Sequence, residues 1–293
     1  MQEAVIIKAL SGFYYVKCDG KEISCRARGR FRLDGTPPLV GDRVRFEHTQ
    51  DGSGYLQELL PRRNFFIRPA VANVDYLVLI AANVNPITDP HIIDRVAVIA
   101  EAASCGVIVC INKCDLDPGD ELFEIYSGMG YKTIRTSAKT GEGIDELRKA
   151  IDGKASAFTG NSGVGKSSLL NALSPGLSLT TGEVSERLGR GRHTTRHIEF
   201  FTLSCDTYIA DTPGFASFDL TQMAPIKKER LQELFPEFRE FIGTCRFDDC
   251  MHLKEPGCEI TEAVKAGRIH PSRYDSYVKL FEIVSGFKAW EQK

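Results

Sequence analysis

The chain has 293 residues, 42% of them hydrophobic and 26% charged, which is typical of a globular protein and long enough for two or three domains. Its formal net charge of −2 argues against general coating of nucleic acid. Residues 1–68 nevertheless carry 12 basic and 8 acidic side chains, so contact with a polyanion is expected to begin in this part of the chain.

The first 60 residues consist of short strand-forming stretches separated by Gly, Pro and Asp, with no helical period. This pattern predicts a small closed β-barrel. The chain starts with only a short branched run, Val5–Ile7, before Lys8, so neither a signal peptide nor a membrane span is expected. Residues 61–69 are predicted to form a linker.

Four arginines alternate with small or apolar residues within the predicted barrel: Arg26, Arg28, Arg30 and Arg32. On a strand, a period of two would place all four guanidinium groups on one face. Arginine binds phosphate oxygens in a bidentate manner, so this face predicts contact with RNA. A solvated outer face of the barrel would produce the same pattern.

From residue 74 the pattern changes to apolar strands that alternate with helices, which predicts a doubly wound α/β sheet. The strands are expected at 74–82, 106–112, 132–137 and 154–160, and the helices near 90–104, 120–129, 143–151 and 165–173. Two more strands, 197–203 and 207–212, are close enough in the chain to pair directly. Beyond residue 220 the sequence is helical and polar, interrupted by a group of cysteines and a histidine.

The segment G-N-S-G-V-G-K-S at 160–167 follows an apolar strand and precedes a helix, which is the context of a phosphate-binding loop. Its backbone N–H groups and the helix N-terminus would hold phosphate oxygens. Lys166 would contact the β- and γ-phosphates as a catalytic group, and Ser167 would bind Mg²⁺. A glycine-rich turn with the same letters is the alternative.

Two further motifs predict which nucleotide base the site binds. Asp115 of N-K-C-D, at 112–115, could accept both N–H groups of a guanine edge, and S-A-K at 137–139 could donate a backbone N–H to the guanine carbonyl. Each motif alone is weak, but together, each after a strand, they indicate GTP rather than ATP. The predicted GTP contacts are Asn112, Lys113, Cys114, Asp115, Ser137, Ala138, Lys139, Gly160, Asn161, Ser162, Gly163, Val164, Gly165, Lys166, Ser167, Ser168 and Gly214.

These motifs stand in an unusual order, since the base motifs precede the phosphate loop and D-T-P-G follows it at 211–214. The strand that carries D-T-P-G therefore leads out of the nucleotide domain. Asp211 fits a position near Mg²⁺, and Thr194 or Thr195 should supply another magnesium ligand from a loop that orders around the γ-phosphate. A solvated basic loop is the alternative for residues 185–197.

The residues after D-T-P-G, Phe215 and Ala216, cannot orient an attacking water as a glutamine does in many GTPases. The nearest replacement is His193, which we predict to be catalytic. A histidine at that position could also be an ordinary surface residue.

Cys245, Cys250, His252 and Cys258 lie within a short segment and offer three thiolates and one imidazole, a set that suits one structural Zn²⁺. Nine cysteines without a secretion signal indicate a reducing cytosol, where metal binding is more common than disulfides. Scattered core or free side chains are the alternative. The zinc module is expected to have a core separate from that of the nucleotide domain.

The order N-K-x-D, S-A-K, phosphate loop, G-R-H-T-T-R, D-T-P-G and Cys-Cys-His-Cys resembles that of the circularly permuted GTPases of small ribosomal subunit biogenesis, the RsgA (YjeQ or YloQ) family. The resemblance covers essentially the whole chain. It implies an N-terminal all-β OB-fold at 1–68, a circularly permuted α/β P-loop GTPase domain at 69–220, and a C-terminal α-helical zinc-binding domain at 221–293.

The same resemblance implies a cytoplasmic factor in late maturation of the small subunit, with slow hydrolysis that the subunit stimulates. Its expected partners are that subunit, its rRNA and GTP or GDP, with Mg²⁺ accompanying GTP. Nothing in the sequence requires a dimer, so a monomer is expected. The alternative function is a regulatory GTP-binding switch that acts on a protein partner.

Overall fold

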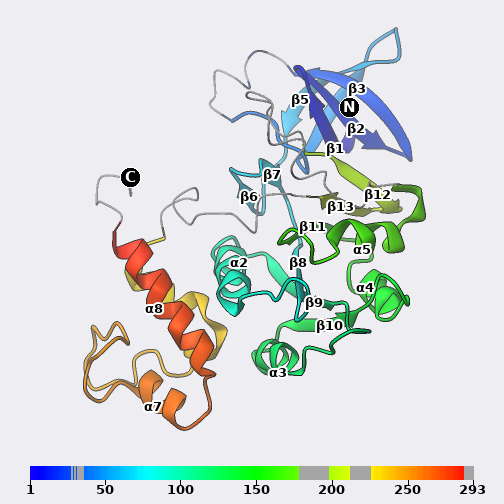
Figure 1. Cartoon of the computed structure of the whole chain (residues 1–293). Helices are drawn as coiled ribbons and strands as arrows, with labels where there is room; N and C mark the ends of the chain where they lie inside the picture. Colours follow the sequence, from blue (N-terminus) through cyan, green and yellow to red (C-terminus); the bar gives the residue numbers. More distant parts are fainter. Residues whose placement is uncertain (28, 30, 32–35, 178–197, 212–225, 287–293) are drawn as a thin grey trace.

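The computed structural model describes residues 1–27, 29, 31, 36–177, 198–211 and 226–286. These residues form a barrel, an α/β sheet with its helices, and a helical module, in that order along the chain (Figure 1). The predicted fold class, which joins these three architectures, is confirmed.

The N-terminal part is a closed barrel with the strand order β1-β2-β3-β5-β4. Its strands are β1 (Gln2–Leu10), β2 (Phe13–Cys18), β3 (Lys21–Ala27), β4 (Arg43–His48) and β5 (Gly54–Leu59). Alternate residues of these strands point inward, and the fully buried side chains Ile6, Val16, Phe46 and Leu56 fill the interior. The barrel predicted from the short strands is therefore present.

The prediction that a single strand carries Arg26 to Arg32 is wrong. Strand β3 ends at Ala27, Gly29 lies in a turn, and Phe31 has helical backbone and is buried in the barrel core. The backbone of this segment therefore does not follow the alternation of the sequence, as happens where tertiary context overrides a strand pattern. Arg26 is exposed beside the Phe13 ring, at 5.0 Å, whereas Arg28, Arg30 and Arg32 lie outside the described residues.

The segment 61–69 is not the free linker that its composition suggested. Strand β6 (Phe65–Phe66) pairs with β7 (Val71–Ala72) as a short hairpin. The Arg62 guanidinium binds both carboxylate oxygens of the fully buried Asp42 at 2.7 Å. This pair joins the hairpin to the barrel, because a buried carboxylate needs such a partner.

The central sheet has the order β10-β9-β8-β11-β13-β12. Its strands are β8 (Tyr76–Ala82), β9 (Gly106–Asn112), β10 (Lys132–Thr136), β11 (Ala155–Gly160), β12 (Phe200–Ser204) and β13 (Thr207–Asp211). All are parallel except β12, which pairs antiparallel with β13, as their closeness in the sequence predicted. The carboxyl ends of the five parallel strands therefore meet at one edge, where open α/β sheets bind ligands.

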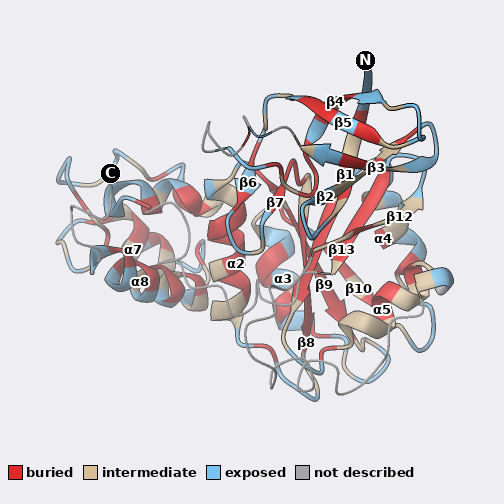
Figure 2. Cartoon of the chain, turned by 90° about the horizontal axis from the view of Figure 1, so that it is seen from above, coloured by how far each residue is buried: buried red, intermediate tan, exposed pale blue. Residues whose placement is uncertain are grey.

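Helices cover both faces of this sheet, and the strands between them are buried (Figure 2). One face packs against α2 (Pro90–Ala102) and α3 (Asp120–Gly128), and the other against α4 (Ile144–Ala150), α5 (Lys166–Leu173) and η1 (Pro175–Leu177). On β8, for example, Leu77 and Leu79 face the first pair, whereas Val78 and Ile80 face the second. This is the doubly wound arrangement that the alternating pattern predicted.

The C-terminal module contains η4 (Lys228–Leu234), η5 (Pro236–Phe238), α7 (Glu259–Lys265) and α8 (Pro271–Ser285), and α8 lies alongside α2 (Figures 1 and 2). The expectation of a separate core is wrong, because one cluster of buried side chains continues from the sheet through α2 to η4 and α8. Within the described ranges, no helix combines the length and apolar character needed to cross a membrane.

Candidate functional site

The motifs singled out in the sequence meet at the carboxyl edge of the sheet. N-K-C-D follows β9, S-A-K follows β10, the phosphate loop follows β11, and Asp211 ends β13. Asn112 joins three of them: its buried amide donates to the Val164 carbonyl at 2.8 Å, and its Oδ1 accepts from the Ala138 N–H at 3.4 Å. The base motifs and the phosphate loop are thus held as one unit, although 52 positions separate Asn112 from Val164.

Lys113 extends this unit to a segment that the motifs do not predict. Its ammonium donates to the Gly163 carbonyl at 2.8 Å and to the carbonyl of Asn85. Asn85 lies in the loop before α2, and a Cβ on Gly163 would stand 3.2 Å from the Pro86 ring. Because Lys113 contacts a backbone oxygen of this loop, no side-chain pattern in the sequence could have indicated it.

Asp115 is exposed, and its Oδ1 accepts a hydrogen bond from the hydroxyl of the fully buried Ser137 at 2.7 Å. The same hydroxyl accepts from the Thr140 N–H at 3.1 Å, so the serine side chain is fixed on both sides. A carboxylate held this way is already oriented at the open edge of the sheet before a ligand binds. Binding then costs little side-chain entropy. This geometry suits a ligand with two neighbouring N–H donors.

Two glycines give the phosphate loop its shape. Gly165 has φ +92°, and a Cβ at this position would overlap the amide nitrogen of Asn112. A Cβ on Gly160 would meet the Ile80 carbonyl oxygen of the neighbouring strand. Only glycine, which has no Cβ, fits at these two positions. The loop leads directly into α5, whose first N–H groups face the loop and form the positive end of the helix dipole.

Lys166 forms an ion pair with Asp211, and both side chains are mostly buried, at 14% and 24% exposure. The pair places a cation and a carboxylate beside Ser167, at the first turn of α5. A hydroxyl and a carboxylate are oxygen ligands of the kind that Mg²⁺ prefers, so the donor set fits that ion. Terminal phosphate oxygens would compete with Asp211 for the Lys166 ammonium.

The other predicted nucleotide residues of the described chain lie around these contacts. Val164 is buried, whereas the remaining residues of the three motifs are partly buried or exposed: Cys114, Ala138, Lys139, Asn161, Ser162 and Ser168. His193, Thr194, Thr195 and Gly214 lie outside the described residues. Their assignments stay predictions.

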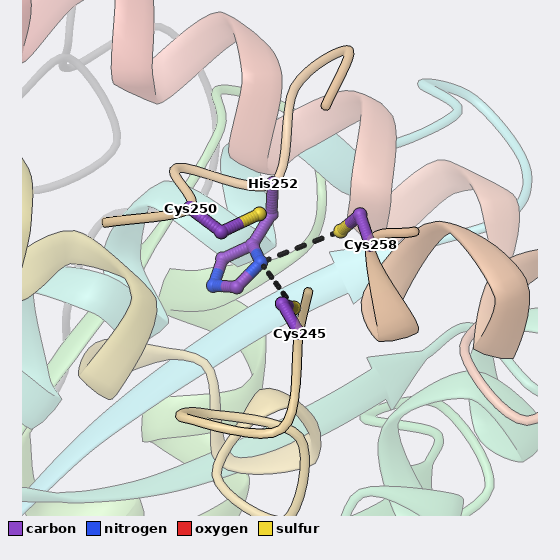
Figure 3. A group of neighbouring side chains, drawn as sticks. All are labelled: Cys245, Cys250, His252 and Cys258. Carbon is purple, nitrogen blue, oxygen red and sulfur yellow. Dashed lines mark hydrogen bonds between the residues drawn. The ribbon is translucent and has the colours of Figure 1, made fainter. Parts of the chain in front are cut away.

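A second site lies in the C-terminal module. The ligand atoms of Cys245, Cys250, His252 and Cys258 are all within 4.8 Å of one another, and three of the four residues are buried (Figure 3). His252 Nδ1 is 3.5 Å from the Cys245 sulfur and 3.4 Å from the Cys258 sulfur. Three sulfurs around one imidazole nitrogen make a closed set, so these residues form a candidate structural zinc site, as predicted.

The chain around this cluster is fixed from α8. The Tyr274 hydroxyl donates to the carbonyls of His252 and Leu253, at 2.9 and 2.8 Å, and the Tyr277 hydroxyl donates to that of Met251 at 2.8 Å. Burial raises the pKa of the Cys250 thiol to about 12. Its thiolate therefore depends on the charge of a bound cation, which suits a site where metal binding releases protons.

The motif order and this edge of the sheet define the chain as a circularly permuted P-loop GTPase. The sequence profile of the RsgA GTPase family matches residues 59–221, and that of the RsgA N-terminal domain matches residues 3–56. The chain therefore belongs to the RsgA family, as its motifs suggested.

Relatives of the chain support this membership over its whole length. "Small ribosomal subunit biogenesis GTPase RsgA" of Caldanaerobacter subterraneus is 45% identical over 282 residues, which cover 95% of this chain and 94% of the relative. The protein of the same name from Bacillus subtilis is 44% identical, with coverage of 95% and 96%.

Two solved structures share the fold. YjeQ from Thermotoga maritima has a TM-score of 0.85 at 39% identity and covers 98% of this chain and 99% of its own. YloQ, described as a circularly permuted GTPase, has a TM-score of 0.81 at 38% identity, with coverage of 98% and 96%. Both alignments cover nearly the whole chain, so the likeness is not confined to one part of it.

Asp115→Asn is expected to exchange guanosine for xanthosine nucleotides. The amide offers a donor where the carboxylate offered an acceptor, which suits the second carbonyl of xanthine and not the amino group of guanine. Loss of a charge-assisted hydrogen bond should weaken GTP binding about 10- to 100-fold. Titrations with GTP and XTP measure this change, and Asp120→Asn, an exposed residue of α3, is the matched control. Unchanged GTP affinity in Asp115→Asn would remove this carboxylate from the base site.

Proposed function

We propose that this chain is a GTP-hydrolysing assembly factor that acts in late maturation of the small ribosomal subunit and is stimulated by that subunit. The observation that carries the proposal is the gathering of three guanine-nucleotide motifs, together with Asp211, at one sheet edge in a chain of the RsgA family. Relatives matched over more than nine tenths of their length bear the name of a small-subunit biogenesis GTPase.

In this proposal Asn112–Asp115 and Ser137–Lys139 select guanine, and residues 160–168 with Gly214 hold the phosphates. Ser167, Asp211 and either Thr194 or Thr195 would hold Mg²⁺, which neutralises phosphate charge when bound. Lys166 would stabilise charge that develops during hydrolysis, and His193 would position the attacking water. The Lys166–Asp211 pair supports these roles, since it keeps both groups next to the phosphate loop.

We further propose the division into an RNA-binding barrel at 1–68, a GTPase domain at 69–220 and a zinc module at 221–293, in a monomeric cytoplasmic protein. The basic balance of residues 1–68 supports contact between the barrel and rRNA. Arg26 is an exposed candidate for that contact, with Arg28, Arg30 and Arg32 as further candidates.

GTP hydrolysis by the purified chain is expected to be slow alone and faster with small ribosomal subunits. A subunit that binds the barrel and the zinc module together would favour one conformation of the GTPase domain. Phosphate release is measured with small subunits, with large subunits and without either, at fixed salt because RNA contacts are salt-sensitive. Equal rates in all three would reject the proposal and favour a switch that acts on a protein partner.

A further inference from the structure

His252 is held from both sides of its ring. Nδ1 faces the sulfurs of Cys245 and Cys258, whereas Nε2 lies 2.6 Å from Oε1 of Gln232 (Figure 3 shows the ring and the thiols). An imidazole binds a metal through an unprotonated nitrogen and then carries its proton on the other one. Whether Nδ1 or Nε2 can bind a metal therefore depends on whether the group next to Nε2 accepts or donates a hydrogen bond.

The orientation of the Gln232 amide answers this question. Its nitrogen donates to the Glu229 carbonyl at 3.1 Å, and a carbonyl can only accept. The amide oxygen must therefore face His252, and an amide oxygen cannot donate to Nε2. The proton is accordingly on Nε2, and the Nδ1 lone pair is left toward the thiols.

We infer that Gln232 is the positioning residue of the metal site: it accepts the Nε2 proton of His252 and so selects Nδ1 as the ligand atom. Gln232 lies on η4, between Leu231 and Leu234, which are 0% and 5% exposed in the core that α2 and α8 share. The acceptor is thus also held by the packing of η4 against α2 and α8. Such outer contacts orient a ligating histidine and raise its affinity for metal.

The contact also ties the metal site to the segment that leaves the nucleotide domain. Along the described chain, η4 is the first helical element after Asp211. Metal binding at His252 therefore holds η4 through Gln232, in addition to the packing of its leucines. This anchoring is independent of the proposed function in ribosome assembly.

Zinc affinity tests the inference directly. In competition with a chromophoric chelator, full-length Gln232→Leu should bind Zn²⁺ about 10- to 100-fold more weakly than the wild type. Gln232→Glu retains an acceptor for the Nε2 proton and should keep or exceed wild-type affinity. Gln50→Leu makes the same change at an exposed residue after β4 and should leave the affinity unchanged. Wild-type affinity in Gln232→Leu would overturn the inference, as would weak binding by Gln232→Glu.

A spectroscopic measurement decides the point without any substitution. In the zinc-loaded wild type, two-bond ¹H–¹⁵N correlation spectra should show His252 with its proton on Nε2 and the metal on Nδ1. Hydrogen exchange should also show that a chelator lowers the protection of the η4 amides. A proton on Nδ1 would overturn the assignment, even if Gln232→Leu failed to fold.

Discussion

Lys166→Ala is expected to lower kcat for GTP hydrolysis about 10²- to 10³-fold, which is the usual effect of removing one preorganised donor from a charged transition state. Lys166 lies at the start of α5, where it pairs with Asp211 beside the phosphate loop. Alanine removes the only charge that this position offers to the γ-phosphate, while the backbone N–H groups of the loop remain. Single-turnover hydrolysis with radiolabelled GTP measures the change separately from product release.

The control is Lys149→Ala, which removes an exposed lysine from α4. It should leave kcat unchanged and thereby exclude a general effect of net charge. Thermal unfolding of Lys166→Ala should show a loss of stability, because the mostly buried Asp211 carboxylate loses its cation. A near-normal kcat in Lys166→Ala would mean that the phosphate loop does not serve hydrolysis.

The sequence predicted that the motifs gather at one edge of the sheet, because each motif follows a strand of a parallel sheet. Strand ends of such a sheet meet at one edge, so Asn112, Ser137 and Gly165 could be placed together before any contact was known. Glycine at position 165 is required by local geometry, and that requirement is visible in the sequence itself. The contact of Lys113 with Asn85 was not predictable, since it involves a backbone oxygen.

Other features depended on packing between distant segments. Strand β3 ends at Ala27, although the alternation that suggested an arginine strand continues in the sequence to Arg32. Asp94, by contrast, stands within the apolar run I-I-D-R-V-A-V-I-A, and a charge on the buried face of a helix indicates a partner. Its partner Arg273 is 179 positions away, so the pairing itself was beyond sequence reasoning.

Asp94 and Arg273 are the centre of the contact between the GTPase domain and the zinc module. Both side chains are fully buried, and the Arg273 guanidinium donates to Asp94 at 2.6 Å and to Glu237 at 2.7 Å. The Tyr126 hydroxyl of α3 donates to Asp94 at 2.8 Å. Four elements, α2, α3, η5 and α8, therefore meet at one network of buried charges, which makes it sensitive to the loss of any member.

Arg273→Met is expected to lower the free energy of unfolding by about 3–5 kcal/mol. Methionine keeps much of the side-chain volume, but it leaves the Asp94 carboxylate buried without a cation. Urea unfolding followed by circular dichroism measures the loss. Arg239→Met is the matched control, because it breaks the exposed ion pair with Glu101, also between the zinc module and α2, and should cost at most about 1 kcal/mol.

The lower free energy of unfolding of Arg273→Met could come from the unpaired carboxylates or from lost packing, and a further variant separates these two causes. If the unpaired carboxylates are responsible, the triple variant Arg273→Met, Asp94→Leu and Glu237→Leu should recover most of the stability, because apolar groups can replace a whole buried ionic set. The three changes should then be strongly non-additive, as expected for residues of one network. Equal costs for Arg273→Met and Arg239→Met would show instead that the shared apolar core, and not the buried charges, holds the zinc module on α2.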